Sequence, residues 1–180
     1  MEKSEMIIYY SHTGENYICG QVKHLKSGIT EKAAVFLQEL TGAMLFRNEP
    51  LVPEPKELSA FVNQTMNDLQ RNARPELLHY PEIQAGMKVI CLVYPNYYNT
   101  MPPAVYSFLE RVDLTGRQIH LFCTHGGDGF GDSAEEIRRL CPGCEIHKGV
   151  DIRDTEITDA REVLKNRLNE EALLTEMEIK

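Results

Sequence analysis

The chain has 180 residues, of which 42% are hydrophobic and 26% are charged, and its formal net charge at pH 7 is -8. This composition is typical of a folded protein with its own core, and the negative charge argues against nucleic acids and anionic membrane surfaces as partners. The longest apolar run, Val89 to Tyr94, is far shorter than the roughly 20 residues that cross a bilayer. We therefore expect no membrane insertion, and because the start MEKSEM lacks the apolar core of a secretory signal, we expect a cytoplasmic location.

The five cysteines are an odd number without an obvious disulfide framework, which favours a reducing compartment. Cys141 and Cys144 have the spacing of a redox pair. They follow a helical pattern, however, and the negative end of a helix dipole raises the pKa of a thiol there. A zinc site needs further ligands at comparable spacing, and the sequence has no second pair of this kind. No metal site is predicted.

The first predicted element is a strand, Met6 to Tyr10, which runs directly into the segment Ser11-His12-Thr13-Gly14-Glu15-Asn16. Small hydroxyl residues, a glycine and an amide have two interpretations at this place. They form an ordinary turn, or their hydroxyl and backbone N–H groups face a phosphate. The segment alone leaves both interpretations open.

The rest of the chain alternates between helical and strand-like patterns. Apolar residues at helical spacing predict the helices, and Gly42 marks the end of the first one. Pro102 and Pro103 suit the first turn of the third helix, and Ser133 and Glu136 have capping-box spacing at the start of the fourth. In chain order we expect a helix over Thr30 to Thr41, a strand over Ala43 to Asn48, a helix over Glu57 to Arg74, a strand over Met87 to Tyr94, a helix from Pro102 to Val112, a strand over Gln118 to Thr124, a helix over Ser133 to Leu140, a strand over Glu145 to Ile152 and a helix from about Asp159 to Leu168.

This alternation predicts an α/β fold with a doubly wound, five-stranded parallel sheet of strand order 2-1-3-4-5 between two layers of helices. No linker separates two halves, so one domain over residues 1–180 is expected. Ligands of such sheets bind beyond the carboxyl ends of the strands, where the first and third strands are neighbours. Unusual loops do follow the first, third and fourth strands, with the sequences SHTGEN, YPNYYNTMPP and THGGDGFGDS, whereas the loops after the second and fifth strands are unremarkable.

These three loops resemble those of the flavodoxins, and in particular the longer flavodoxin-like proteins with a Gly-Glu-Asn-Tyr phosphate loop. The likeness spans nearly the whole chain. The second loop has the form Pro-x-aromatic-aromatic-x-Thr-x-Pro, and the third is similar to Thr-Ser-Gly-Gly-x-Gly-Phe-Gly. The resemblance implies that the chain binds FMN: the first loop would hold the phosphate, the second would line the flavin ring, and the glycines of the third would allow close backbone approach.

The resemblance assigns residues of all three loops, and one residue of the first helix, to FMN. They are Ser11, His12, Thr13, Gly14, Glu15, Asn16, Thr30, Pro95, Asn96, Tyr97, Tyr98, Asn99, Thr100, Thr124, Gly126, Gly127, Asp128, Gly129 and Phe130. No catalytic residue is assigned. Plainer alternatives remain open for some of them: Tyr97 and Tyr98 as an exposed pair at a loop tip, His12 as a solvent-facing side chain, and Phe130 as a core residue.

An insertion of about residues 17–28, which some relatives share, separates the phosphate loop from the first helix. Three features depart from the family pattern. Ile29 stands in place of an asparagine, which would remove one hydrogen bond, worth ~1 kcal/mol, although Thr30 still offers a hydroxyl. The chain has no Trp, and His125 and Asp128 replace small hydroxyl residues. A carboxylate of Asp128 near the ring would disfavour the anionic reduced flavin and lower its potential.

The leading interpretation is an FMN-binding redox protein that transfers electrons to a partner protein or to a small acceptor. Two alternatives stay open, so the sequence does not decide whether the protein is an enzyme. One is an NAD(P)H-dependent FMN quinone or flavin reductase. The other is a module of the same fold that has lost FMN and serves in binding or regulation, which Ile29, Asp128 and the missing Trp favour.

Overall fold

The computed structural model describes residues 5–170, so the first four residues of the MEKSEM segment and residues 171–180 lie outside the described part. In chain order the elements are β1 (Glu5–Tyr9), β2 (Gly14–Ile18), β3 (Gln21–Leu25), α1 (Ile29–Thr41), β4 (Met44–Arg47), α2 (Leu58–Gln70), β5 (Val89–Pro95), α3 (Pro103–Arg111), β6 (Gln118–His125), α4 (Ser133–Leu140), β7 (Glu145–Arg153), the 3-10 helix η1 (Asp154–Asp159) and α5 (Ala160–Glu170). Among these residues, no helix is long and apolar enough to cross a membrane.

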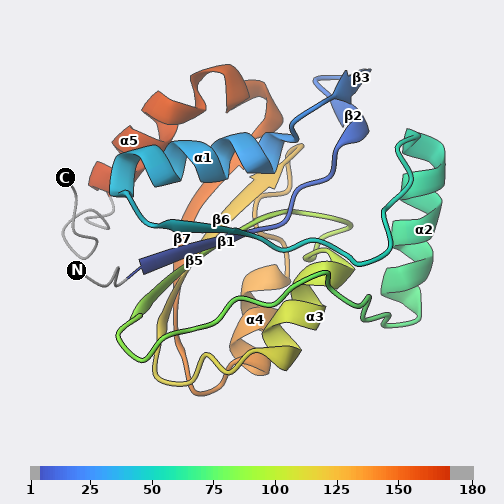
Figure 1. Ribbon diagram of the computed structural model, residues 1–180. Helices are drawn as coiled ribbons and strands as arrows, with labels where there is room; N and C mark the ends of the chain where they lie inside the picture. The colour runs from blue at the N-terminus through green and yellow to red at the C-terminus, as the bar shows by residue number, and fades with distance from the viewer. Residues whose placement is uncertain (1–4, 171–180) are drawn as a thin grey trace.

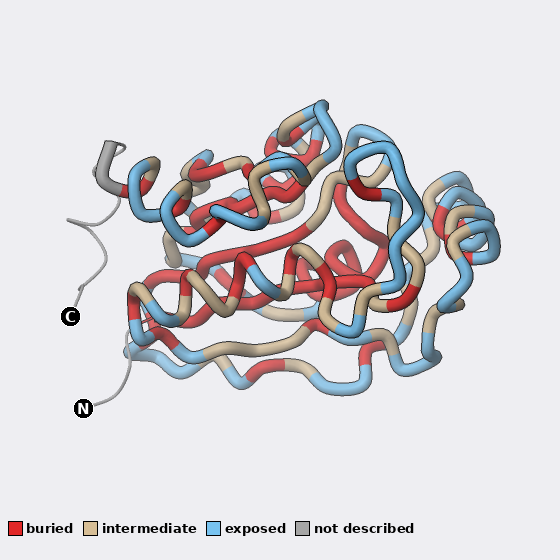
Figure 2. The backbone as a smooth tube through the Cα atoms, turned by 90° about the horizontal axis from the view of Figure 1, so that it is seen from above, coloured by how far each residue is buried: buried red, intermediate tan, exposed pale blue. Residues whose placement is uncertain are grey.

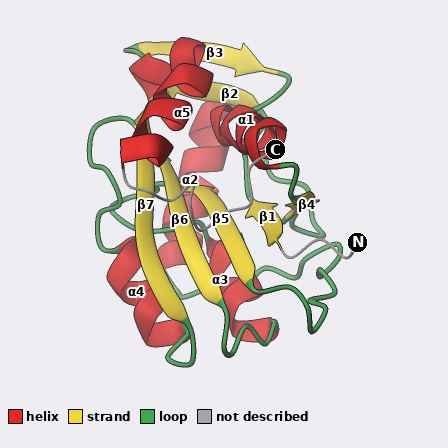
Figure 3. Cartoon of the chain, turned by 90° about the vertical axis from the view of Figure 1, so that its left-hand side faces the viewer, coloured by secondary structure: helices red, strands yellow, loops and turns green. Residues whose placement is uncertain are grey.

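Five strands form a parallel sheet in the order β4-β1-β5-β6-β7. These strands are the predicted ones, so the order 2-1-3-4-5 is confirmed, with β5 in the middle (Figure 3). Helices α1 and α5 cover one face of the sheet, and α3 and α4 cover the other (Figure 1). The three predicted layers are therefore present.

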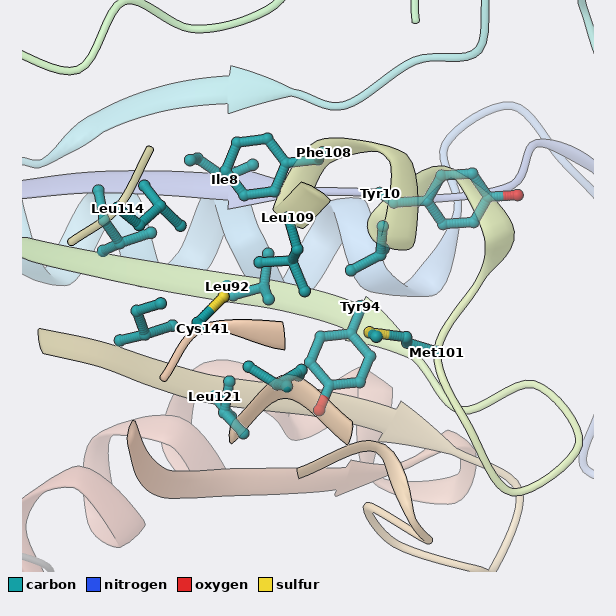
Figure 4. Close-up of a cluster of buried hydrophobic side chains, with 14 of the residues drawn as sticks. Ile8, Tyr10, Leu92, Tyr94, Met101, Phe108, Leu109, Leu114, Leu121 and Cys141 are labelled. Atoms are coloured by element: carbon teal, nitrogen blue, oxygen red, sulfur yellow. The ribbon is translucent and has the colours of Figure 1, made fainter. Parts of the chain in front are cut away.

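The two faces of the sheet bury two separate cores because successive residues of a strand point to opposite sides. Ile8 and Tyr10 belong to the core beneath α3 and α4, whereas Ile7 and Tyr9 belong to the core beneath α1 and α5. The buried residues run along the strands through the middle of the molecule (Figure 2), and Figure 4 shows the first core closely packed. Each large apolar side chain buried there contributes roughly 1.5–3 kcal/mol.

The predicted insertion forms an antiparallel hairpin of β2 and β3, which lies apart from the main sheet (Figures 1 and 3). The hairpin begins earlier than expected, because Gly14, Glu15 and Asn16 already belong to β2. Glu15 is held by the segment before α2: its N–H donates to the Lys56 carbonyl at 2.8 Å, and its carboxylate accepts from the Leu58 N–H at 2.9 Å. These contacts over a long sequence separation fix the conformation.

Helix α2 stands beyond the carboxyl ends of the strands, next to β2 and α3 (Figure 1). It ends at Gln70 and not at Arg74, because Asn72 has a φ of 51°, in the left-handed region that a helix does not continue through. The segment that leads into it, after β4, contacts the end of β1. This segment, between β4 and α2, is unremarkable in composition, as expected, but it lies close to the loop after β1.

The capping box predicted for Ser133 and Glu136 is wrong. Asp132 precedes α4, and within the described residues no side chain caps this helix. The Ser133 hydroxyl is buried, donates to the Phe130 carbonyl at 2.6 Å and lies 2.8 Å from the Tyr94 hydroxyl. The Glu136 carboxylate accepts a hydrogen bond from the Thr100 hydroxyl at 2.7 Å. Both side chains thus fasten the loops at the carboxyl edge instead of the helix end.

Candidate functional site

A cavity of about 130 Å³ lies at the carboxyl edge of the sheet, where β1, β5 and β6 end and α1 begins. It brings together residues of all three predicted loops with residues of the hairpin, α1 and η1. The residues that line it are Ser11, His12, Asn16, Tyr17, Ile29, Thr30, Pro95, Asn96, Tyr97, Thr124, His125, Gly126 and Asp154. Segments far apart in the sequence therefore form one site.

The amino terminus of α1 is packed directly against the loop after β1. Gly28 precedes the helix, and no side chain of the described residues caps it. A Cβ atom at Gly28 would lie 2.1 Å from the Ser11 Oγ and 2.3 Å from the His12 carbonyl oxygen, so only glycine fits. The first N–H groups of a helix have no partners within the helix, and its dipole is positive at this end. The arrangement suits an anion.

Several buried polar atoms beside this helix end have no hydrogen-bond partner in the described part of the chain. They are the Ser11 Oγ, both ring nitrogens of His12 and the Nδ1 of His125. Ser11 is 6% exposed and His12 is 4% exposed, so solvent does not satisfy them. An unsatisfied buried polar group typically destabilises the folded state by about 1–3 kcal/mol. A ligand with oxygen atoms in the cavity would offset that cost.

His12 is buried, so the alternative of a solvent-facing side chain is wrong for this residue. Its ring stacks on Phe61 of α2, with ring centroids 3.6 Å apart and an interplanar angle of 12°. Its Nδ1 lies 3.6 Å from the nearer carboxylate oxygen of Glu54, too far for a hydrogen bond. Helix α2 therefore holds the ring in place and leaves the nitrogens available.

A pair of buried threonines connects α1 to β6 across the floor of the cavity. The hydroxyls of Thr30 and Thr124 lie 2.6 Å apart, and either can be the donor. Because one hydroxyl hydrogen is used between them, the pair keeps one hydrogen for a ligand. Ile29 also lines the cavity, where the family pattern has an asparagine, so its side chain contributes an apolar surface.

The loop after β5 is a tight turn that separates the two adjacent tyrosines. Tyr97 and Thr100 exchange backbone hydrogen bonds of 2.8 and 3.1 Å, and Tyr98 and Asn99 between them have φ values of 52° and 70°. Positive φ at both central residues defines a type I′ turn. Tyr98 sits at the exposed tip, with 52% of its surface accessible, and lies outside the cavity lining. The alternative of an exposed loop tip thus holds for Tyr98 only.

Tyr97 turns inward and forms an aromatic wall with its neighbours. Its ring makes edge contacts with Tyr10 at a centroid distance of 6.1 Å and with Phe61 at 5.6 Å. Burial raises the pKa of Tyr10 well above its ordinary value, and the nearby Tyr97 and Glu54 raise it further. Burial likewise raises the pKa of Tyr97. Both phenols stay neutral at ordinary pH, and Tyr97, the one that lines the cavity, presents an uncharged aromatic surface to it.

The glycine-rich loop after β6 contributes Gly126 to the cavity, and its other residues lie elsewhere. Phe130 is buried in the core beneath α3 and α4, which decides its open alternative. Asp128 is exposed outside the lining residues, so the structure gives no support to a carboxylate of Asp128 beside the ring. The Asn96 amide donates to the Gly129 carbonyl at 2.7 Å and joins this loop to the one after β5.

Several predicted site residues therefore lie outside the cavity lining because other contacts hold them. The Thr13 hydroxyl accepts from the Lys56 ammonium at 2.5 Å, and the Asn99 amide donates to Asp132 at 2.6 Å. The full set outside the lining is Thr13, Gly14, Glu15, Tyr98, Asn99, Thr100, Gly127, Asp128, Gly129 and Phe130.

The lining includes four residues that were not assigned to the site, namely Tyr17, Ile29, His125 and Asp154. Ile29 and His125 lie within the matched motifs, so their positions pointed to the site. They were not assigned to it because each differs in residue type from the family pattern. Asp154 follows the last strand, and its carboxylate accepts from the Cys19 N–H of the hairpin at 2.9 Å. That contact joins two segments whose proximity no sequence pattern indicated.

The chain belongs to the flavodoxin family, because the family model described as flavodoxin matches residues 22–170. The match begins inside the hairpin, so the likeness of residues 11–16 to a phosphate loop rests on those residues themselves. A search of the curated proteins finds no match.

Solved structures share the fold. Two proteins provisionally assigned as flavoproteins are similar. The one from Bacteroides eggerthii has 21% sequence identity and a TM-score of 0.66, and the match covers 91% of this chain and 99% of that chain. The one from Bacteroides uniformis has 18% sequence identity and a TM-score of 0.68, and the match covers 92% of this chain and 99% of that chain. A flavoprotein from Lactobacillus acidophilus, crystallised in complex with FMN, matches at 14% identity and a TM-score of 0.59, over 88% of this chain and 98% of that chain. At these identities the likeness shows the fold alone.

Proposed function

We propose that this flavodoxin-family protein binds FMN in the cavity at the carboxyl edge and transfers electrons through it. One observation carries the proposal: the uncapped amino terminus of α1 meets buried polar atoms of Ser11 and His12 that lack partners in the described structure. A phosphate supplies acceptors for all such donors and a charge that the helix dipole favours. The residues present therefore fit the phosphate end of this cofactor.

Each part of the lining has a role in the proposal. The Ser11 hydroxyl and the first N–H groups of α1 bind the phosphate, and the Thr30 and Thr124 pair adds one hydroxyl donor. Tyr97 provides an aromatic wall, and Gly126 permits close approach of the backbone. The flavin, when bound, supplies reversible electron transfer, and the chain positions it and shields its phosphate.

The size of the cavity bears on how far a bound flavin would be enclosed. Its volume of about 130 Å³ is smaller than the roughly 300–1,000 Å³ of sites that enclose a whole organic ligand. A flavin would therefore be only partly enclosed, with an edge open to solvent. An open edge allows contact with a redox partner protein or a small acceptor.

A titration with FMN and with riboflavin tests the proposal. Riboflavin has the same ring and no phosphate, so it isolates the contribution of the α1 terminus. We expect quenching of FMN fluorescence with a dissociation constant below about 1 μM, and affinity for riboflavin lower by roughly 100-fold, about 2.7 kcal/mol. A protein that stays colourless and leaves FMN fluorescence unchanged contradicts the proposal.

A second candidate is an FMN-dependent reductase that uses NADH or NADPH to reduce a quinone or a flavin. The observation that favours it is the ring of His125 beside the cavity, with a carboxylate behind it, because two-electron reductions consume protons. Steady-state turnover with a quinone above the blank with unbound FMN would establish a reductase. Turnover equal to the blank leaves the carrier.

The third candidate, a module that has lost FMN, is favoured by the apolar Ile29 in the lining and by the exposed position of Tyr98. Submicromolar affinity for FMN excludes it.

We also infer one flavodoxin-like domain and a cytoplasmic location. The odd number of cysteines in the sequence and their spacing support a reducing compartment.

A further inference from the structure

His125 and Asp151 form a hydrogen-bonded pair at the edge of the cavity. His125 ends β6, and Asp151 lies on the neighbouring strand β7. The Nε2 of His125 is 2.9 Å from the Oδ2 of Asp151. The other ring nitrogen, Nδ1, is buried and has no partner in the described residues, and the residue lines the cavity. One side of the ring thus meets a carboxylate, and the nitrogen on the other side has no hydrogen-bond partner among the described residues.

Positively and negatively charged side chains both lie around the pair. The charged groups around it on β7, η1 and α5 are Arg153, Asp154, Glu156 and Arg167.

Arg167 is the cation closest to the Asp151 carboxylate, but it does not replace His125 as its partner. Its guanidinium donates to the Asp151 carbonyl oxygen, lies 3.7 Å from the Oδ1 and also pairs with Glu156 at 3.0 Å. The Oδ2 of Asp151 stays directed at the imidazole. The Asp151 side chain is 43% exposed, so the pair is next to solvent as well as to the cavity.

The Asp151 carboxylate determines which tautomer neutral His125 adopts. A carboxylate accepts hydrogen bonds, so neutral His125 carries its hydrogen on Nε2, and the lone pair of Nδ1 is left on the other side of the ring. A second proton at Nδ1 makes an imidazolium whose charge Asp151 stabilises. His12, the other histidine of the lining, has no carboxylate within hydrogen-bond distance.

We propose that His125, oriented by Asp151, takes up one proton at Nδ1 when electrons enter the cofactor of this site. The inference rests on the proposed function. Two electrons pass to the flavin from a reduced redox partner protein or from NAD(P)H, together with the one proton that the reduced ring itself binds in wild type and variant alike. The additional proton comes from solvent and forms the Nδ1–H bond of His125, and Asp151 stays ionised. The imidazolium then offsets the negative charge of the reduced ring, so His125 makes the reduction potential depend on pH.

The midpoint potential of the FMN-loaded protein as a function of pH tests the inference, with His125→Gln as the variant. One coupled proton changes the reduction equilibrium tenfold per pH unit, which is about 30 mV for a two-electron couple. We expect the wild-type slope to be steeper than that of His125→Gln by about this amount. Asp151→Asn removes the charge behind the ring and should flatten the slope as well.

Asp154→Asn is the matched control, because Asp154 also lines the cavity and its carboxylate accepts a hydrogen bond from the Cys19 N–H instead of from His125. This variant should shift the potential by a similar amount at every pH and keep the wild-type slope. Equal slopes in wild type and His125→Gln overturn the inference. A merely structural role for His125 would lower affinity for FMN or thermal stability without changing the slope.

Nitrogen NMR of the imidazole gives an independent readout on the protein without FMN. Neutral His125 should show its hydrogen on Nε2, and its signal is identified by its loss in His125→Gln. A neutral ring with its hydrogen on Nδ1 overturns the inference even if FMN binds. Absence of FMN binding overturns the proposed function itself and is seen in the titration before any potential is measured, so the two failures are distinguishable.

Discussion

The two ends of the sheet both have cavities, and the larger one is at the end without the predicted site. At the amino ends of the strands a cavity of about 880 Å³ is lined by charged residues such as Glu5, Lys88 and Arg117. The cavity at the carboxyl ends is about 130 Å³. In a parallel sheet with crossover helices, helix amino termini lie at the carboxyl ends of the strands. The direction of the helix dipoles and the buried polar atoms of Ser11 and His12, and not volume, thus mark the site.

Cysteine reactivity offers the largest expected contrast and concerns the amino end. Burial, with a smaller contribution from the nearby Cys144, raises the pKa of Cys141 to about 12, and burial also raises the pKa of Cys144. The pair therefore has little thiolate at pH 8. We expect iodoacetamide to modify the exposed Cys19 roughly a thousandfold faster than Cys141, measured by peptide mass spectrometry. Comparable modification rates of Cys19 and Cys141 in the folded protein would support a redox role for Cys141 and Cys144. Unfolded protein, in which all thiols are accessible, is the control.

Gly28→Ala should produce the next largest effect. The new Cβ would overlap the Ser11 hydroxyl and the His12 carbonyl, so the loop and the start of α1 must separate. We expect affinity for FMN to fall roughly 100-fold or more, about 3 kcal/mol, in a fluorescence titration. Gly143→Ala is the matched control at the amino end, where the closest atom is the Thr115 methyl group at 3.0 Å. If Gly28→Ala binds FMN as tightly as Gly143→Ala, FMN does not bind against the amino terminus of α1 at the carboxyl end of the sheet.

Ser11→Ala should separate binding from stability. The hydroxyl has no partner in the described structure, so replacing it should leave the free energy of unfolding unchanged or raise it. Affinity for FMN should fall roughly tenfold, because a charge-assisted hydrogen bond is worth about 1.5–3 kcal/mol. Denaturant unfolding and FMN titration measure the two effects.

Ser107→Ala is the control for that experiment. Its hydroxyl is buried on α3 and donates to the Pro103 carbonyl at 3.3 Å. This variant should lose about 1 kcal/mol of stability and keep its affinity. Ser11→Ala with lower stability and unchanged affinity would show that Ser11 belongs to the scaffold and not to the site.

Tyr98→Ala should have the smallest effect. The side chain is exposed at the tip of the turn, so we expect affinity within about threefold of wild type and stability within about 0.5 kcal/mol. Tyr97→Ala, its neighbour, should lower both, since that ring contacts Tyr10 and Phe61 and lines the cavity. Fluorescence titration of the two variants side by side checks the contrast, and a larger loss of affinity in Tyr98→Ala would reverse the assignment of the two tyrosines.

The sheet was predictable because its pattern is local and repeated. Alternating apolar runs and helical segments set the parallel strands and their order, and β1, β5 and β6 end where the unusual loops begin. Glu15 shows where this reasoning stops. A motif placed it on a phosphate, whereas the structure pairs it with Leu58, 43 residues away. No periodicity reports which partner a carboxylate finds across such a separation.

The site was predictable in its location and only partly in its members. Loop sequences indicate which segments meet, but not which way each side chain points within them. Tyr97 and Tyr98 are adjacent and matched the same motif, yet the turn directs one inward and the other outward. His125 and Asp128 both departed from the family pattern, and the structure makes His125 the one that lines the cavity, since β7 supplies its partner.

Amide NMR during a titration with FMN tests the central claim most directly, because it compares both ends of the sheet in one experiment. We expect the largest shifts on the amides of Gly28, Ile29, Thr30 and Gly126, and no shift on the amides of residues 115–118 at the amino end. Saturation of those shifts at a stoichiometry of one FMN per chain would establish the site. Largest shifts at residues 115–118, or none anywhere, would contradict the account.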